Sequence, residues 1–118
     1  MKQSSTFAWI VAIALIWPSA NALAEHFLGK TAVSEFNDSD WSMLEKARDK
    51  ALDTEPDGAT ISWKNPETKH WGTVTPVSTK HERGTICRRV AFVNHASKRT
   101  GQSAFTYCKI DGTWKVAE

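Results

Sequence analysis

The fold is decided by two stretches of sequence, which read ICRRVAFVNH over residues 86–95 and QSAFTYCKI over residues 102–110. Both are rich in β-branched and aromatic residues and show the period of two that is typical of β-strands. If they pair around a loop of residues 96–99, Cys87 stands directly opposite Cys108, close enough to bond in a non-hydrogen-bonded pair. The hairpin therefore predicts a cross-strand disulfide between Cys87 and Cys108.

Alternation gives this hairpin two apolar faces. We expect one face to lie under a helix, and it carries Cys87, Ala91, Val93, Ala104, Cys108 and Ile110. The other face carries Ile86, Val90, Phe92, Phe105 and Tyr107. The far face of a sheet covered by one helix normally carries polar side chains. An apolar far face indicates either a sheet that curls to bury both faces or a surface that binds a partner.

A helix is predicted before the sheet, over residues 38–53. Asn37 is a good N-cap, and Phe36 and Trp41 have the spacing of a hydrophobic staple. One apolar stripe at helical spacing consists of Trp41, Leu44, Ala47, Ala51 and Leu52. Further strands are expected at residues 60–64, 71–79 and 113–116, with turns at 65–68, 81–84 and 111–112. The predicted fold is α+β, with one N-terminal helix packed on an antiparallel sheet of about five strands.

The first 24 residues have the pattern of a signal peptide. Lys2 is followed by an apolar run over residues 7–17, and Ala22-Leu23-Ala24 is a small-x-small cleavage site. The alternative is an uncleaved anchor, but this run is about 11 residues long against the roughly 20 needed to span a bilayer. We expect cleavage after Ala24 and no stable membrane span afterwards. Residues 25–35 are predicted to be a flexible entry segment and residues 36–118 a single domain.

Charge is divided unevenly along the mature chain. Residues 25–58 have a net charge of −5, and residues 59–118 have a net charge of +6. The two halves can complement each other within one fold, or the basic half can bind an anionic envelope component or an envelope protein. Export argues against nucleic acid as a partner.

Six residues are candidates for binding, and all lie in the predicted sheet. Arg88 and Arg89 point to opposite faces of their strand, so one should reach solvent and the other should pair with a helix acid such as Glu45 or Asp49. Flat aromatic rings bind sugar faces and apolar loops. The full set is Trp71, Arg88, Arg89, Phe92, Phe105 and Tyr107.

No catalytic or metal-binding pattern is present. The four histidines, at positions 26, 70, 81 and 95, lack zinc-ligand spacing, and no cofactor is predicted. The cysteine pair favours a disulfide over a thiol nucleophile. Glu67 and Glu82 lie in predicted turns, which fits turn chemistry better than a catalytic pair of carboxylates.

An ordered series of short motifs resembles a known family. The series is Trp63-Lys64-Asn65-Pro66-Glu67-Thr68, Gly72-Thr73-Val74-Thr75-Pro76, Cys87-Arg88, Cys108-Lys109 and Asp111-Gly112-Thr113-Trp114. It resembles the C-terminal domain of the bacterial surface-antigen family typified by the rickettsial seventeen-kilodalton antigen, over roughly residues 36–117. It departs in having Lys69 where a turn glycine is usual and in lacking the lipid-acceptor cysteine of many relatives.

The resemblance implies an exported protein, periplasmic, secreted or associated with the outer membrane. It implies a non-catalytic role in which the domain binds another envelope component. Two alternatives stay open. One is a peptidoglycan-acting hydrolase or an inhibitor of such an enzyme, with a cleft lined by Glu67 or Glu82 and a tryptophan. The other is a thiol-redox protein that uses the cross-strand disulfide.

Overall fold

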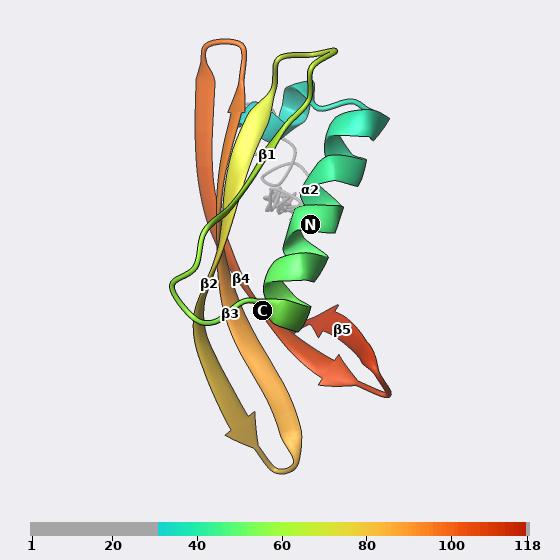
Figure 1. Cartoon of the computed structure of the whole chain (residues 1–118), viewed down its shortest axis with the longest axis vertical. Coiled ribbons are helices and arrows are strands. Elements are labelled where there is room, and N and C mark those ends of the chain that lie inside the picture. Colours follow the sequence, from blue (N-terminus) through green and yellow to red (C-terminus); the bar gives the residue numbers. More distant parts are fainter. Residues whose placement is uncertain (1–30, 118) are drawn as a thin grey trace, which may run out of the picture.

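The computed structural model describes residues 31–117 and contains one α-helix packed on one five-stranded sheet. The predicted signal peptide, residues 25–30 and Glu118 lie outside the described residues. The elements are η1 (Ala32–Glu35), α2 (Asp38–Thr54), β1 (Ile61–Lys64), β2 (Trp71–Glu82), β3 (Thr85–Ala96), β4 (Arg99–Ile110) and β5 (Thr113–Val116). All neighbouring strands are antiparallel, in the order β1-β2-β3-β4-β5. Figure 1 shows α2 lying along one face of the sheet, with β5 near the C-terminal end of the helix. The predicted fold class is confirmed.

Helix α2 begins at the predicted cap. The Asn37 side chain accepts a hydrogen bond from the Asp40 amide at 2.9 Å, and the Asp40 carboxylate accepts one from the Asn37 amide at 3.0 Å. This reciprocal pair is a capping box. Phe36 meets Trp41 edge to face at 5.6 Å between ring centroids, which is the predicted staple. The capping box and the staple involve only residues close together in the sequence, so the start of the helix could be predicted from the sequence.

The central hairpin has the predicted register. Pairing runs from Ala96 opposite Arg99 to Cys87 opposite Cys108, and the two sulfurs are bonded at 2.07 Å. The predicted cross-strand disulfide is therefore confirmed. The turn between β4 and β5 has the expected positive φ angles, 50° at Asp111 and 79° at Gly112.

The helix covers the opposite face of the sheet from the one expected. Val90, Phe92 and Tyr107 are buried beneath α2, whereas Cys87 and Ala91, on the other face, are only half-buried. The prediction that the disulfide face lies under the helix is wrong. Each aromatic side chain buries roughly 150–250 Å². The face that carries the aromatic residues therefore buries more apolar area, and it packs against the helix. The second apolar row is the core itself. The buried core consists of Leu44, Ala47, Ala51, Leu52, Trp63, Val74, Val90, Phe92 and Tyr107.

Ordered structure begins earlier than the sequence indicated. Its start was predicted near Phe36, but residues 32–35 form the short helix η1 and Ala32 is completely buried. A Cβ added to Gly101 would lie 3.6 Å from the Ala32 amide nitrogen, so β4 and η1 are in close contact. Among residues 31–117, no helix is both long and apolar enough to cross a membrane.

The two outer strands are much shorter than the three inner ones. Each outer strand has 4 residues and each inner strand has 12. Strand β1 pairs only with residues 71–74 of β2, and β5 pairs only with residues 107–110 of β4. Beyond β1, the edge of β2 contains Pro76 and a register shift between Pro76 and Ser78, and the Pro76 carbonyl accepts a hydrogen bond from Gly58. In the described part of the chain, no strand pairs with residues 100–105 of β4 on the side away from β3.

Candidate functional site

A half-open groove lies between α2, η1 and the inner strands β3 and β4. Its cavity has a volume of about 240 Å³. Trp41 and Phe105 are each 40% exposed at this groove, and Phe92 and Tyr107 are among its buried lining residues. The remaining lining residues are Thr31, Val33, Leu44, Arg48, Asn94, Gly101, Gln102 and Ser103. We call this site the α2–β4 groove.

The aromatic residues of the groove are positioned by the helix start and by the strands. The staple with Phe36 fixes Trp41, and strand alternation places Phe92 and Tyr107 on the helix side of the sheet. Phe92 contacts Phe105 and Tyr107 edge to face, with centroids 6.1 and 6.5 Å apart. Three of the six candidate binding residues, Phe92, Phe105 and Tyr107, therefore meet at one site.

The chemistry of the groove is that of an apolar receptor with one cationic neighbour. The Arg48 guanidinium lies 6.0 Å from the centroid of the Tyr107 ring. Burial raises the pKa of Tyr107 above its ordinary value, so this phenol stays protonated at neutral pH. A cavity of 240 Å³ is smaller than the roughly 300–1,000 Å³ of sites for drug-sized ligands. The groove is suited to one large apolar side chain.

Arg88 does not line the groove and serves the fold. It is 7% exposed and donates to the Ala51, Leu52 and Glu55 carbonyls at 2.7–2.8 Å. It also donates to the Asp57 carboxylate at 2.9 Å and to the Thr79 hydroxyl at 2.9 Å. The expected partners Glu45 and Asp49 are wrong, because Arg88 reaches the end of the helix and not its acidic side. Its contacts cap the C-terminus of α2.

The Arg88 contacts also set the charge state of their acidic partner. Hydrogen bonds from Arg88 and then Thr79 hold the pKa of Asp57 below its usual value. The last turn of α2 contains no basic residue. Arg88 therefore supplies, from β3, the positive charge that a helix C-terminus favours.

Arg89 and Trp71 lie on the uncovered face of the sheet, away from the groove. Arg89 reaches solvent, as one of the two arginines was expected to, and lines a hollow of about 350 Å³ with Lys80 and Glu82. Trp71 is 41% exposed and stacks on His95 with ring centroids 3.6 Å apart. The six candidates thus divide into three at the groove, one at the helix end and two on the uncovered face.

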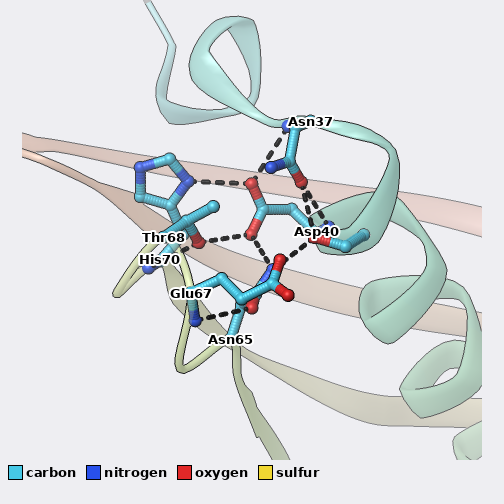
Figure 2. Close-up of polar contacts among 7 residues, drawn as sticks. Asn37, Asp40, Asn65, Glu67, Thr68 and His70 are labelled. Atoms are coloured by element: carbon cyan, nitrogen blue, oxygen red, sulfur yellow. Dashed lines mark hydrogen bonds and ion pairs between the residues drawn. The ribbon is translucent and has the colours of Figure 1, made fainter.

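A buried polar cluster around Asp40 was not recognised in the sequence. Figure 2 shows its carboxylate pointing into the turn that follows β1. One oxygen accepts hydrogen bonds from Asn65 Nδ2 at 2.9 Å and Thr68 Oγ1 at 2.7 Å. The other accepts from the Asn37 amide at 3.0 Å and lies 2.9 Å from His70 Nδ1. Since an ionised carboxylate only accepts hydrogen bonds, His70 Nδ1 carries a proton.

The Asp40 cluster holds the start of the helix against the sheet. Burial acts to raise the pKa of Asp40, but hydrogen bonds from Thr68, Asn37, His70 and Asn65 outweigh it and lower the pKa overall. The signal in the sequence was an aspartate three residues after a helix cap, together with an Asn-Pro-x-Thr turn whose polar side chains need a buried acceptor. Asn65 and Thr68 of the motif series are therefore structural.

Metal-ligand groups and the two glutamates of the hydrolase hypothesis, Glu67 and Glu82, are side chains that a catalytic arrangement in the described residues could use. Within residues 31–117, no group of three histidine, cysteine, aspartate or glutamate side chains is placed to hold a metal ion. The Glu67 amide donates to the Asn65 side chain at 3.1 Å within the predicted turn. The hollow that contains Glu82 has no tryptophan in its lining, so it lacks the pairing that the hydrolase hypothesis requires.

Comparison with known proteins finds similar surface antigens from Rickettsia species. The 17 kDa surface antigen of Rickettsia bellii strain RML369-C is 29% identical over 82 residues, which cover 68% of this chain and 52% of that protein. The 17 kDa surface antigen of Rickettsia prowazekii strain Madrid E is 31% identical over 85 residues, with the same coverage. The chain spans about half the length of these curated relatives. No solved structure matches it significantly.

The match to a family profile covers most of the described domain. Residues 50–115 match a family described as 17 kDa outer membrane surface antigen. This range includes the last five residues of α2 and contains all five strands except the end of β5. The resemblance seen in the motif series is confirmed, and the chain belongs to the 17 kDa outer membrane surface antigen family.

Proposed function

We propose that this protein is an exported, non-catalytic protein of the bacterial envelope, periplasmic or associated with the outer membrane. It binds another envelope protein through the α2–β4 groove. The leader pattern of residues 1–24 and the surface-antigen names of its relatives support the envelope location.

The observation that carries the binding role is the composition of the groove. Protein interfaces are enriched in aromatic residues and arginine, and their anchors sit in preformed pockets. The groove offers Trp41 and Phe105 at its opening, Tyr107 at its base and the Arg48 guanidinium over Tyr107. This set of side chains favours a protein partner that inserts an apolar side chain.

Photo-crosslinking in the living cell tests the proposal. A photoreactive phenylalanine analogue is placed at position 105 in the full-length precursor, in its native host. The matched control has the same analogue at Ile110, which is 45% exposed in the same strand but on the other face. We expect a specific crosslink to an envelope protein from position 105 and none from position 110. Equal crosslinking from both positions, or none from position 105, contradicts the proposal.

Export is tested separately by the intact mass of the protein from the periplasmic fraction. A chain that begins at Glu25 and carries no free thiols is the expected result. Retention of residues 1–24 would contradict the predicted cleavage. This measurement leaves the groove untouched, so the two parts of the proposal can fail independently.

An anionic envelope component is the alternative partner, favoured by the hollow on the uncovered face. Lys80 and Arg89 line it beside the hydroxyls of Ser78 and Thr106, and Glu82 is the one carboxylate among its described lining residues. Arg89→Gln should weaken the binding of inorganic pyrophosphate about tenfold, the effect of losing about 1.4 kcal/mol. Lys46→Gln, on the exposed side of α2, makes the same change in net charge and should have no effect. Equal affinities in a calorimetric titration exclude this alternative.

A further inference from the structure

We infer that the free edge of β4 takes up an extended segment of the partner protein as an added sixth strand. This inference rests on the proposed function and specifies how the groove is used. It names the partner chemistry as an extended chain with one large apolar side chain.

The first step is that no described strand pairs with half of β4 on the side away from β3. Residues 107–110 pair with β5, and among the described residues no strand occupies the same side at residues 100–105. A strand edge presents a row of unpaired N–H and C=O groups, which is a template for pairing with another chain. The vacant length is 6 residues, close to the roughly 5–6 residues of an average strand.

The second step identifies which backbone groups face outward. The Thr106 carbonyl accepts a hydrogen bond from the Ala117 amide at 2.7 Å, so Thr106 points toward the β5 side. In an antiparallel ladder, every second residue points its N–H and C=O to the same side. Ala104 and Gln102 therefore direct their amides and carbonyls to the free edge.

The third step connects this edge to the groove. Gly101, Ser103 and Phe105 lie on the helix side of β4, and all three line the groove. An added strand alternates its side chains in the same way, so every second residue enters the groove. Thr31 and Ala32 pack over Gly101, so the space for one large side chain lies over the small Ser103, beside Phe105. Main-chain hydrogen bonds supply affinity in this mode of recognition, and the pocket supplies specificity.

A proline substitution in the edge separates this inference from other ways of using the groove. Ala104→Pro removes one outward N–H without removing a bond to β3, and proline is tolerated on an edge whose N–H faces solvent. Ala104→Ser keeps the N–H and is the matched control. Phe105→Ser removes the aromatic wall and leaves the backbone edge intact.

The probe is a library of random dodecapeptides displayed on phage and selected against the oxidised mature protein. We expect selected peptides to share one large apolar residue flanked by β-formers. As soluble peptides, they should bind at least tenfold more weakly to Ala104→Pro than to Ala104→Ser in fluorescence anisotropy. Methylation of the peptide amides that face β4 should abolish binding.

Each other outcome overturns a specific statement. Peptides that bind Ala104→Pro and Ala104→Ser equally but lose affinity for Phe105→Ser contradict strand addition and leave the groove as the binding site. Peptides whose affinity is unchanged by Phe105→Ser contradict both strand addition and the groove as the binding site. If the mature protein is dimeric by light scattering and Ala104→Pro makes it monomeric, the edge binds a second copy of the chain. This result overturns the partner segment as the occupant. If the protein binds peptide only after residues 25–30 are deleted, the edge is assigned to that segment of the same chain. This result also overturns the partner segment as the occupant.

Discussion

Replacing Arg88 should destabilise the domain more than the loss of any other single polar side chain on the sheet. Its guanidinium connects β3 to the last carbonyls of α2, more than 30 positions earlier in the chain. Arg88→Met keeps much of the apolar stem and removes every donor. The expected effect is a large loss in the free energy of unfolding with an unchanged fold.

The magnitude follows from the acceptors that lose their partner. The Ala51 and Leu52 carbonyls belong to residues that are 0% and 2% exposed, and each buried unsatisfied acceptor costs about 1–3 kcal/mol. Water can reach the Glu55 carbonyl and the half-exposed Asp57 through the open hollow next to them, which limits the loss there. We expect about 3–5 kcal/mol in total, within the range for two buried acceptors that lose their donor. For a domain of this size that corresponds to roughly 12–40 °C in Tm.

Urea unfolding at pH 7, followed by far-ultraviolet circular dichroism, measures this loss. Arg88→Lys keeps the charge but not the planar fork, so it should lose about half as much. The matched control is Arg89→Met, whose arginine is exposed and makes one long hydrogen bond of 3.5 Å to Thr106. It should change stability by less than about 0.5 kcal/mol. An Arg88→Met domain within about 1 kcal/mol of the unsubstituted protein would refute the capping role, as would equal losses for the two arginines.

Three further predictions concern stability. The folded pKa of Asp40 lies below its unfolded value of about 3.9, so its contribution is complete above that pH and is lost as pH falls through the folded pKa. Thr68→Val removes one bond to this carboxylate, and urea titrations between pH 5 and pH 2 should show a smaller acid-induced loss than in the unsubstituted protein; an equal loss would contradict the assignment. Gly72→Ala should cost about 1–3 kcal/mol, because its Cβ would lie within 2.9 Å of three atoms of β1 and β3. An unchanged urea midpoint would show that these strands can separate freely. Replacing Cys87 and Cys108 together by alanine should cost about 3 kcal/mol in the same titration, and equal midpoints would mean that the strand register alone holds the hairpin.

Local signals in the sequence predicted the elements of this fold well. The capping box at Asn37 and the Asp111-Gly112 turn are decided by residues within a few positions of each other, and both were correctly placed. The disulfide was predictable because the two-residue period of paired strands fixes which cysteine faces which.

The face of the sheet beneath the helix could not be predicted from alternation alone, because both rows are apolar. Comparing the apolar area of the two rows would have decided it, since Phe92 and Tyr107 outweigh Ala91 and Cys87. The partners of Arg88 were missed for a different reason. Carbonyl groups at a helix end carry no sequence signature, so a search for acidic side chains overlooks them.

The sequence predicted some residues of the candidate site, the α2–β4 groove, and missed others. Phe92, Phe105 and Tyr107 were named from their strand spacing, and they meet in the groove. Trp41 was assigned to the core stripe of the helix, yet it is 40% exposed. The staple with Phe36 fixes the Trp41 ring locally, but its exposure depends on how η1 and α2 pack against the sheet, which is a tertiary arrangement that no local pattern encodes.

The unequal edges of the sheet limit how copies of this domain can associate. Open-ended polymers need two complementary edges on each molecule, one to accept and one to donate. The β2 edge is interrupted by Pro76 and a bulge, and its outer neighbour β1 is only 4 residues long. Among residues 31–117, β4 has the longest uninterrupted stretch of outer edge without a paired strand, so pairing of two copies through this stretch uses it once in each molecule and closes at a dimer. The asymmetry of the two edges therefore favours closed association of copies over open-ended polymers.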